Sequence, residues 1–385
     1  MCGYLLDKRR VGKNMSGTVE KKRCLEIATR SDWAGAQKVV YTIARGIKEN
    51  YANKMDIEVA CGNGTGVLIS ELEKIGVRVH VVPDLLRELS PSKDLKAYFQ
   101  IKKIVEEGQF DIVHLHNSKV RILGGMAAKK LKVNNIVYTV HGWWHIEQYA
   151  GLKRHVFILA ERIGARYSNK VVFLCRKDMQ KAKDWKIGNE KQYEVIPNAI
   201  IPEPIVEKGS LRREIGVKDG IKIVGNVARL DPQKNPIRFL ETAKMVLNHI
   251  NNVVFVWIGG SVVEDKSGKQ VEHWLKMNPE IADKFYFLPF RSDATKLMAD
   301  FDVFLLTSDS EGMPLVILEA IDRGVPVVST DVGCVGEMIG EAAQSDDELV
   351  QMVTNRLLNE RNEDQISWTY DNFISAYYTL YNMSE

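Results

Sequence analysis

The stretch DIVHLHNSKVRILGGMAAKKLKVNNIVYTVH, residues 111–141, contains one complete unit of the expected fold. Residues 111–116 and 136–141 are short runs rich in β-branched side chains, as in buried strands. The intervening residues 119–131 have the length and apolar spacing of a helix. A strand, a helix and a second strand in this order predict a βαβ unit of a parallel sheet.

The same alternation continues on both sides of this unit. Before the middle of the chain, strands are expected at residues 24–28, 57–61, 77–82 and 171–175, and helices at 35–50, 67–74, 92–107 and 152–167. A short strand at 195–196 precedes PNAIIPEP, residues 197–204, where three prolines in eight residues predict a linker. Beyond it, strands are expected at 221–224, 253–258, 285–288, 303–306 and 325–329, and helices at 236–248, 271–276, 294–299, 314–323, 347–359 and 366–381.

This pattern predicts an α/β protein with two doubly wound, Rossmann-like domains, and 385 residues suit two such domains. Residues 1–22 form a basic extension that could be disordered. Residues 23–204 form the first domain and residues 205–365 the second. Residues 366–385 form a terminal helix that could cross back to the first domain. Two such domains place a ligand between the carboxyl ends of their strands.

Composition narrows the class of protein. A hydrophobic content of 45% and a charged content of 27% are typical of a globular chain. No apolar run approaches the length of about 18 residues that a membrane span requires, and none follows the basic N-terminus as in a signal peptide. The five cysteines are scattered and form no CxxC pair. We therefore expect reduced cysteines in a cytoplasmic protein, rather than disulfides or a zinc site.

Charge is distributed unevenly along the chain. Residues 1–205 contain 35 Lys and Arg against 22 Asp and Glu, whereas residues 206–385 contain 18 against 28. The basic half suits an anionic partner, either a membrane surface or a lipid diphosphate, although an ordinary solvated surface would show the same bias. Trp33, Trp143 and Trp144 could support membrane contact or lie in the core. No nucleic-acid-binding motif is present, so nucleic acid is not an expected partner.

The segment SDSEGMPLVILEA, residues 308–320, follows an expected buried strand and opens a helix. Free amides around Gly312 and Met313 would suit a phosphate group. Glu311 and Glu319 are eight residues apart, about 12 Å along a helix, which suits two carboxylates that hold distant hydroxyls of one ligand. A capped amphipathic helix with solvated glutamates would have the same spacing.

Two further segments follow expected strands. Arg229 and Lys234 lie in GNVARLDPQKN, residues 225–235, where two cations could neutralise a diphosphate, although both could be ordinary surface residues. His141 lies in YTVHGWWH, residues 138–145, beside a glycine at the end of a strand. Catalytic side chains gather at such positions, but a structural histidine is also common there.

Together these segments resemble retaining GT-B glycosyltransferases of carbohydrate family four. Residues 308–320 are similar to the Glu-x7-Glu motif of that family, and RGVPVVSTDVG, residues 323–333, is similar to the segment that follows it. The resemblance implies that Glu311 contacts the donor sugar and Glu319 the ribose. It assigns backbone contacts to the donor to Gly312, Met313 and Leu315.

Two motifs outside that segment extend the resemblance. Arg229 and Lys234 match the family's Arg-x4-Lys motif, which implies contact with the donor phosphates. His141 matches its Thr-x-His-Gly element, which implies a catalytic role beside the donor sugar.

Two weaker similarities lie in the first half. VHLHNSK, residues 113–119, is similar to a His-Ser-Ser-Lys region of capsule and O-antigen members, which would place His116 and Lys119 beside acceptor or phosphate groups. A core histidine and a helix cap would also explain this segment. Gly35 stands where the family has a Gly-Gly loop, with Ala34 in place of the first glycine.

The resemblance implies a retaining transferase that uses a nucleotide diphosphate sugar, UDP in preference to GDP. The acceptor would be a glycan or a polyprenyl-diphosphate-linked glycan of a cell-surface polysaccharide, reached at the cytoplasmic membrane face. No cofactor and no metal are expected, and the Asp-x-Asp pattern at Asp300 and Asp302 is interpreted as chance. A nucleotide-sugar epimerase of related fold and an inactive nucleotide-sugar-binding protein remain alternatives.

Overall fold

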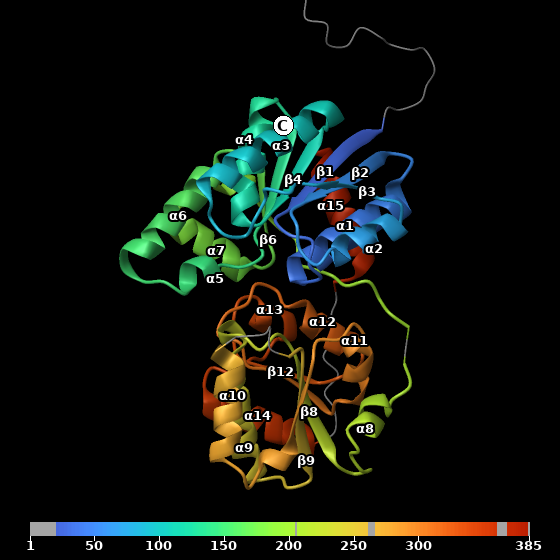
Figure 1. Ribbon diagram of the computed structural model, residues 1–385, viewed down its shortest axis with the longest axis vertical. Coiled ribbons are helices and arrows are strands. Elements are labelled where there is room, and N and C mark those ends of the chain that lie inside the picture. Colours follow the sequence, from blue (N-terminus) through green and yellow to red (C-terminus); the bar gives the residue numbers. More distant parts are fainter. Residues whose placement is uncertain (1–20, 205, 261–265, 360–367, 384–385) are drawn as a thin grey trace, which may run out of the picture.

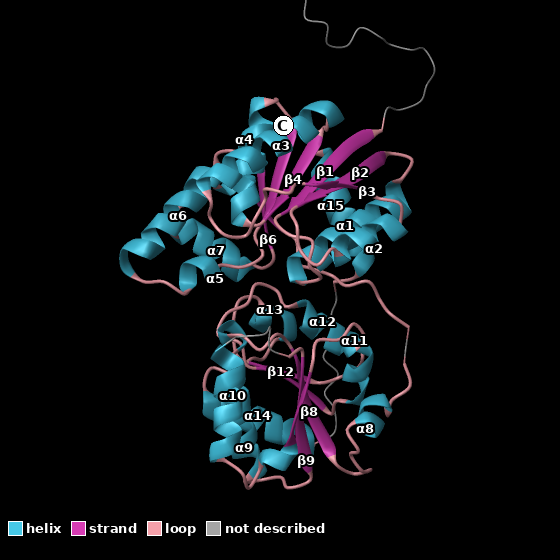
Figure 2. Ribbon diagram, in the orientation of Figure 1, coloured by secondary structure: helices cyan, strands magenta, loops and turns pink. Residues whose placement is uncertain are grey.

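The computed structural model describes residues 21–204, 206–260, 266–359 and 368–383. Most of the predicted basic extension, residues 1–20, lies outside the described residues. The described chain forms two lobes, each built on a parallel sheet with helices packed around it (Figures 1 and 2). The predicted fold class is confirmed.

The first domain contains a seven-stranded parallel sheet with the order β3-β2-β1-β4-β5-β6-β7 in the described residues. Its strands are β1 (Lys22–Ala28), β2 (Met55–Cys61), β3 (Arg78–Val81), β4 (Ile112–His116), β5 (Asn135–Thr139), β6 (Lys170–Phe173) and β7 (Tyr193–Val195). Its helices are α1 (Gly35–Tyr51), α2 (Val67–Lys74), α3 (Pro91–Gly108), α4 (Ser118–Lys130), α5 (Trp144–Glu147), α6 (Gly151–Ala165) and α7 (Arg176–Asp184).

The second domain contains a five-stranded parallel sheet with the order β10-β9-β8-β11-β12 in the described residues. Its strands are β8 (Lys222–Val227), β9 (Val253–Ile258), β10 (Phe285–Leu288), β11 (Val303–Leu306) and β12 (Val327–Ser329). Its helices are α8 (Ser210–Glu214), α9 (Pro236–Leu247), α10 (Lys266–Met277), α11 (Ala294–Leu297), α12 (Leu315–Asp322), α13 (Val335–Ile339) and α14 (Asp346–Leu358).

Strand order reverses beside the first strand of each sheet, between β1 and β4 and between β8 and β11. At such a switch point the loops leave neighbouring strands in opposite directions and open a crevice at their carboxyl ends. In the first sheet the register pairs Ala28 with His116 and His116 with Thr139. The last residues of three adjacent strands therefore lie level with one another at this point.

The last described helix, α15 (Tyr370–Asn382), packs in the first domain although it follows the second in sequence (Figure 1). Phe373, Tyr377 and Tyr381 are buried in one cluster with Val40 and Ile43 of α1. Burial of each large apolar side chain contributes roughly 1.5–3 kcal/mol. The first domain is therefore built from two separate parts of the chain.

The prediction of secondary structure misses four short helices, α5, α7, α8 and α13. Three of them contain only four or five residues, which is too short for a helical period to be visible. The fourth, α7, has the sequence RKDMQKAKD and buries only Asp178 and Ala182, so no apolar stripe marks it. No helix among the described residues has the length and apolarity needed to cross a membrane.

Candidate functional site

Lys234 and Glu311 form an ion pair between the loops that follow β8 and β11. The Nζ of Lys234 lies 2.6 Å from Oε1 of Glu311, and Ser308 Oγ donates to the same oxygen at 2.6 Å. Both charged side chains are largely buried, with 17% and 7% of their surface exposed. The two residues that the sequence assigns to the donor therefore lie together at the switch point of the second sheet.

Glu319 lies on α12 and reaches the first domain. Its Oε1 accepts a hydrogen bond from Nζ of Lys38 at 2.6 Å, and Lys38 is the fourth residue of α1. The predicted ribose-binding carboxylate is thus paired with a lysine of the facing domain. Gly35, the first residue of α1, is exposed near this contact.

The loops that contain His141 and Gly312 touch across the two domains. A Cβ atom on Gly312 would collide with the backbone oxygen of His141, so only glycine allows this approach. Gly333 has a φ of +55°, and a Cβ there would collide with the backbone oxygen of Glu311. Gly312 therefore allows the close approach of the two domains, and Gly333 allows the close packing of two loops within the second domain.

His141 and His116 are joined directly in the first domain. Nε2 of His141 lies 2.9 Å from Nδ1 of His116, and the two rings are stacked at a centroid distance of 5.2 Å. Burial, reinforced by the nearby rings of His116 and His114, holds the pKa of His141 well below its usual value. His141 is therefore neutral near pH 7 and suited to hydrogen bonding rather than to carrying a charge.

Other predicted site residues have partners that the sequence does not indicate. Arg229 is about half exposed and pairs with Asp231 at 2.7 Å, beside the loop of Lys234. Lys119 pairs with Asp94 of α3 at 2.6 Å, so it links two helices in this structure. The expected contact of Lys119 with a phosphate or acceptor group stays a prediction.

Met313 and Leu315 contact the first domain. Met313 Sδ accepts from the backbone amide of Asn198 at 3.0 Å, and its carbonyl accepts from the Asn198 side chain at 3.3 Å. Leu315 packs with Leu318 into the core cluster of the first domain. The beginning of α12 therefore serves the contact between the domains in this structure.

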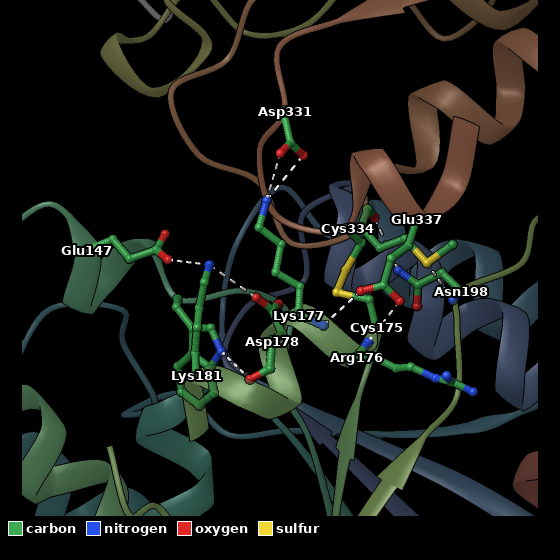
Figure 3. The surroundings of a disulfide bond; sticks show 12 residues. Glu147, Cys175, Arg176, Lys177, Asp178, Lys181, Asn198, Asp331, Cys334 and Glu337 are labelled. Carbon is green, nitrogen blue, oxygen red and sulfur yellow. Dashed lines mark hydrogen bonds and ion pairs between the residues drawn. A yellow bond between two sulfur atoms is a disulfide. The ribbon is translucent and has the colours of Figure 1, made fainter. Parts of the chain in front are cut away.

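The expectation of unpaired cysteines is wrong for one pair. Cys175, which follows β6, forms a disulfide with Cys334, which precedes α13, at a Cα–Cα distance of 5.5 Å (Figure 3). Their separation of 159 residues, with one cysteine in each domain, hides the pairing from local sequence patterns. Cys24 and Cys61 are free and buried, and Cys2 lies outside the described residues.

Polar contacts surround this disulfide and also join the two domains (Figure 3). The Glu337 carboxylate accepts from the backbone amides of Arg176 and Lys177 at 3.0 and 2.8 Å. These amides begin α7, where a negative charge is favoured by the helix dipole. Lys177 Nζ also pairs with Asp331 at 3.1 Å. The second domain thus caps a helix of the first.

Two buried groups of side chains have the donor atoms that metals prefer. Glu26, His114 and His116 form one group, and Cys175, Asp178 and Cys334 form the other. The first is joined by hydrogen bonds to α15, and the second contains the disulfide.

The Asp-x-Asp pattern has a structural explanation. Asp300 accepts from the amides of Leu211 and Arg212, and Asp302 pairs with Arg212 and Lys222. These carboxylates therefore stabilise the beginning of α8 and the beginning of β8.

Two charged residues that were not predicted contact the predicted site. Lys38 pairs with Glu319, and Glu26, which has no exposed surface, lies 3.3 Å from Nε2 of His116. A glutamate in the apolar strand CLEIA, residues 24–28, was a visible signal, because buried carboxylates require partners. Lys38 gave no such signal, since its partner lies in the other domain.

Comparison with known families accounts for both domains. Residues 33–203 match the family Glycosyltransferase Family 4, and residues 207–375 match the family Glycosyl transferases group 1. A galactosyltransferase of Escherichia coli is 32% identical over 286 residues, 72% of each chain. This chain is a family 4 glycosyltransferase. Since both family models and this relative are glycosyltransferases, the alternative of an epimerase loses its support.

Two curated relatives of this glycosyltransferase have informative names. The Escherichia coli relative is named UDP-Gal:alpha-D-GlcNAc-diphosphoundecaprenol alpha-1,3-galactosyltransferase. A Campylobacter jejuni relative, 26% identical with 69% of this chain and 71% of its own covered, is named N,N'-diacetylbacillosaminyl-diphospho-undecaprenol alpha-1,3-N-acetylgalactosaminyltransferase. Both names describe transfer to a lipid-diphosphate-linked sugar.

Solved structures share the fold of this glycosyltransferase. Anabaena HepE, crystallised with UDP and glucose, superposes with a TM-score of 0.76 at 18% identity and covers 94% of this chain and 99% of its own. Sucrose-phosphate synthase of Thermosynechococcus elongatus has a TM-score of 0.69 at 14% identity, with 94% and 95% covered. At these identities the likeness establishes the two-domain architecture alone.

Proposed function

We propose that this glycosyltransferase transfers a sugar from a UDP-sugar, with retention of configuration and without a metal ion, to a polyprenyl-diphosphate-linked glycan used in cell-surface polysaccharide synthesis. The observation that carries the proposal is the Lys234–Glu311 pair at the switch point of the second sheet, opposite His141. The names of the two curated relatives support the lipid-linked acceptor, and that of the Escherichia coli relative supports the UDP-sugar.

In the proposed reaction the donor diphosphate lies at the carboxyl ends of β8 and β11. Lys234 and Arg229 stabilise the negative charge that develops on the leaving phosphate. Glu311 accepts hydrogen bonds from sugar hydroxyls, and Glu319 exchanges its contact with Lys38 for the ribose hydroxyls. The acceptor hydroxyl attacks the anomeric carbon from the side of the leaving group. The bond to the phosphate breaks, and a phosphate oxygen takes the hydroxyl proton.

A donor panel tests this assignment. We expect UDP-sugars, rather than GDP- or ADP-sugars, to raise the melting temperature, because a ligand that binds the folded state stabilises it. Lys234→Ala should lower kcat/KM by about a hundred- to a thousand-fold, since it removes a cation aimed at the developing charge. Lys269→Ala, on an exposed position of α10, is the matched control. Transfer should persist in EDTA, and nuclear magnetic resonance of the product should show a retained anomeric configuration.

Three results would contradict the proposal. They are stabilisation by GDP-sugars alone, transfer that is unchanged by Lys234→Ala, and activity that is abolished by EDTA.

We propose that the lipid-linked acceptor is reached at a membrane surface and that α6 provides the contact with it. Leu152, Val156, Leu159 and Ile163 lie on one face of this helix with 82%, 57%, 55% and 39% of their surface exposed. Two cations on the same helix, Lys153 and Arg162, are exposed on either side of this apolar stripe. An apolar face flanked by cations suits the interface of an anionic bilayer. Trp143, by contrast, is buried and bonded to the Asp178 carbonyl.

Vesicle sedimentation tests this surface. The protein should bind phosphatidylglycerol vesicles at low salt and bind them less at high salt, because part of the attraction is electrostatic. The double variant Leu152→Glu/Leu159→Glu should lose binding. Leu358→Glu, at a position of α14 that is 68% exposed, should retain it. Equal binding of both variants would exclude α6 as the membrane surface.

A further inference from the structure

Glu26 is a carboxylate in the centre of the first sheet with no exposed surface. Such a group is costly to bury unless hydrogen bonds compensate. Its Oε2 lies 3.3 Å from Nε2 of His116, and its Oε1 accepts from the hydroxyl of Tyr381 at 2.9 Å. Burial alone would raise the pKa of Glu26, but the adjacent rings of His114 and His116 outweigh it and lower the pKa to about 2. Glu26 is therefore ionised at neutral pH.

These contacts continue to the predicted catalytic histidine. His116 faces Glu26 with Nε2 and His141 with Nδ1, at 3.3 and 2.9 Å. The three residues come from β1, β4 and the loop after β5, which are neighbours in the sheet. A continuous line of side chains thus connects a buried negative charge to the loop that touches Gly312 of the second domain.

The line of contacts determines which ring nitrogens carry protons. An ionised carboxylate can only accept hydrogen bonds, so a proton on Nε2 of His116, which lies 3.3 Å from Oε2 of Glu26, is favoured over an unprotonated Nε2 facing that charge. In a His116 ring with a single proton, Nδ1 is then an acceptor and requires a donor from His141. Nε2 of neutral His141 is that donor, which leaves Nδ1 on the other side of the ring as a hydrogen-bond acceptor.

We propose that Glu26 and His116 are positioning residues that fix His141 in the tautomer protonated on Nε2, so that Nδ1 accepts a hydrogen bond from a hydroxyl of the bound sugar. This inference rests on the proposed function, because it deepens the role of His141 in sugar transfer. His114 serves a different part of the network, since it bonds to Tyr381 at 2.7 Å and to Thr139 at 2.8 Å. Removal of the Tyr381 hydroxyl therefore leaves the line from Glu26 to His141 intact.

Glu26→Gln should reverse the tautomer without changing the size of the side chain. The Tyr381 hydroxyl faces Oε1, so the amide oxygen of glutamine takes that position and its NH2 group faces His116. Nε2 of His116 then becomes an acceptor, its Nδ1 carries the proton, and His141 is protonated on Nδ1 instead. In serine proteases, an analogous change of carboxylate to amide inactivates the triad through the wrong histidine tautomer.

The test is nuclear magnetic resonance of the full chain labelled with 15N-histidine, with His141 assigned from the His141→Gln spectrum. In the unaltered protein we expect the Nε2 shift of a protonated nitrogen and the Nδ1 shift of an unprotonated one. Tyr381→Phe should give the same pattern, and Glu26→Gln the reverse. With donor and acceptor, Glu26→Gln should lower kcat by about tenfold to a hundredfold, the range typical of partners that orient an active group. Its KM for the donor should change little.

Each outcome decides a separate point. His141 protonated on Nδ1 in the unaltered protein would overturn the inference, even if no variant can be folded. A reversed tautomer with unchanged kcat would overturn the positioning role. The tautomer is read without any substrate. Failure of every nucleotide sugar to bind would therefore refute the proposed function and the sugar contact of His141. The effect of Glu26 and His116 on the tautomer of His141 would still be tested by the spectrum of the free protein.

Discussion

At the scale of single residues, the site depends on charges that are paired before any ligand is bound. Lys234 holds Glu311, and Lys38 holds Glu319. The spacing of Glu311, Glu319 and Lys234 after expected strands, together with its resemblance to family motifs, predicts these three residues as site candidates. Lys38 has no such pattern, since folding alone brings it to its partner. The sequence therefore predicts candidate groups but not their contacts.

Asp178 supplies a prediction at this scale. Burial raises its pKa to about 6, with Lys181 opposing the shift and Glu147 adding to it. The folded state therefore binds a proton more tightly than the unfolded chain, and stability is highest below the ordinary aspartate pKa and falls as the pH rises to about 6. Asp178→Asn should remove this dependence and raise the free energy of unfolding at pH 7.5 by about 3 kcal/mol at most.

Urea unfolding at pH 4.5 and pH 7.5 measures this effect. Asp184→Asn, at an exposed position of the same helix, should keep the pH dependence of the unaltered chain. If Asp178→Asn also keeps it, Asp178 does not titrate between these values.

At the scale of helices and strands, sequence reasoning succeeds where an element carries its own periodicity. The βαβ rhythm predicts the strands from β1 to β12 within one or two residues at most ends, because each is a compact apolar run. It misses α7, whose nine residues are mostly charged and whose packing depends on Glu337 of the other domain. The helical period of α15 is predictable, but its position in the first domain depends on contacts with β4 and β5.

Removal of a buried aromatic side chain tests the packing of α15. Tyr377 has no exposed surface, and its hydroxyl is hydrogen-bonded to the Thr139 hydroxyl at 3.1 Å. Tyr377→Ala should therefore destabilise the first domain by about 3–5 kcal/mol, as other aromatic truncations in cores do. Calorimetry should show a lower melting temperature for the unfolding transition of the first domain. Ser375→Ala, exposed on the same helix, should leave it unchanged, and a loss confined to the second domain would argue against the packing described for α15.

At the scale of the whole molecule, one disulfide joins the two domains, so it would limit any separation of the domains during exchange of donor and product. Cys175–Cys334, Lys177–Asp331 and Arg176–Glu337 lie together at one side of the interface (Figure 3). Neither the pairing nor this cluster is visible in the sequence, because each contact spans more than 150 residues. How far the domains can move apart therefore depends on whether this cysteine pair is oxidised or reduced.

The third prediction follows from this restriction. A dithiol such as dithiothreitol should convert the Cys175–Cys334 bond to two thiols while it becomes a cyclic disulfide. The reduced protein should show a larger radius of gyration by X-ray scattering and a higher kcat than the oxidised protein. Cys334→Ser should match the reduced protein and no longer respond to dithiothreitol. Equal turnover of the oxidised and reduced forms would show that the bond does not limit exchange.

The return of α15 to the first domain also affects how the protein is made. A ribosome releases β1, β4 and β5 early, but Tyr377 and Tyr381 follow the whole second domain. Until α15 has been made, Glu26 and His114 lack the Tyr381 hydroxyl that bonds to both of them in the folded protein. The first domain therefore acquires its complete core only after the second domain has been synthesised, when α15 becomes available to pack against it.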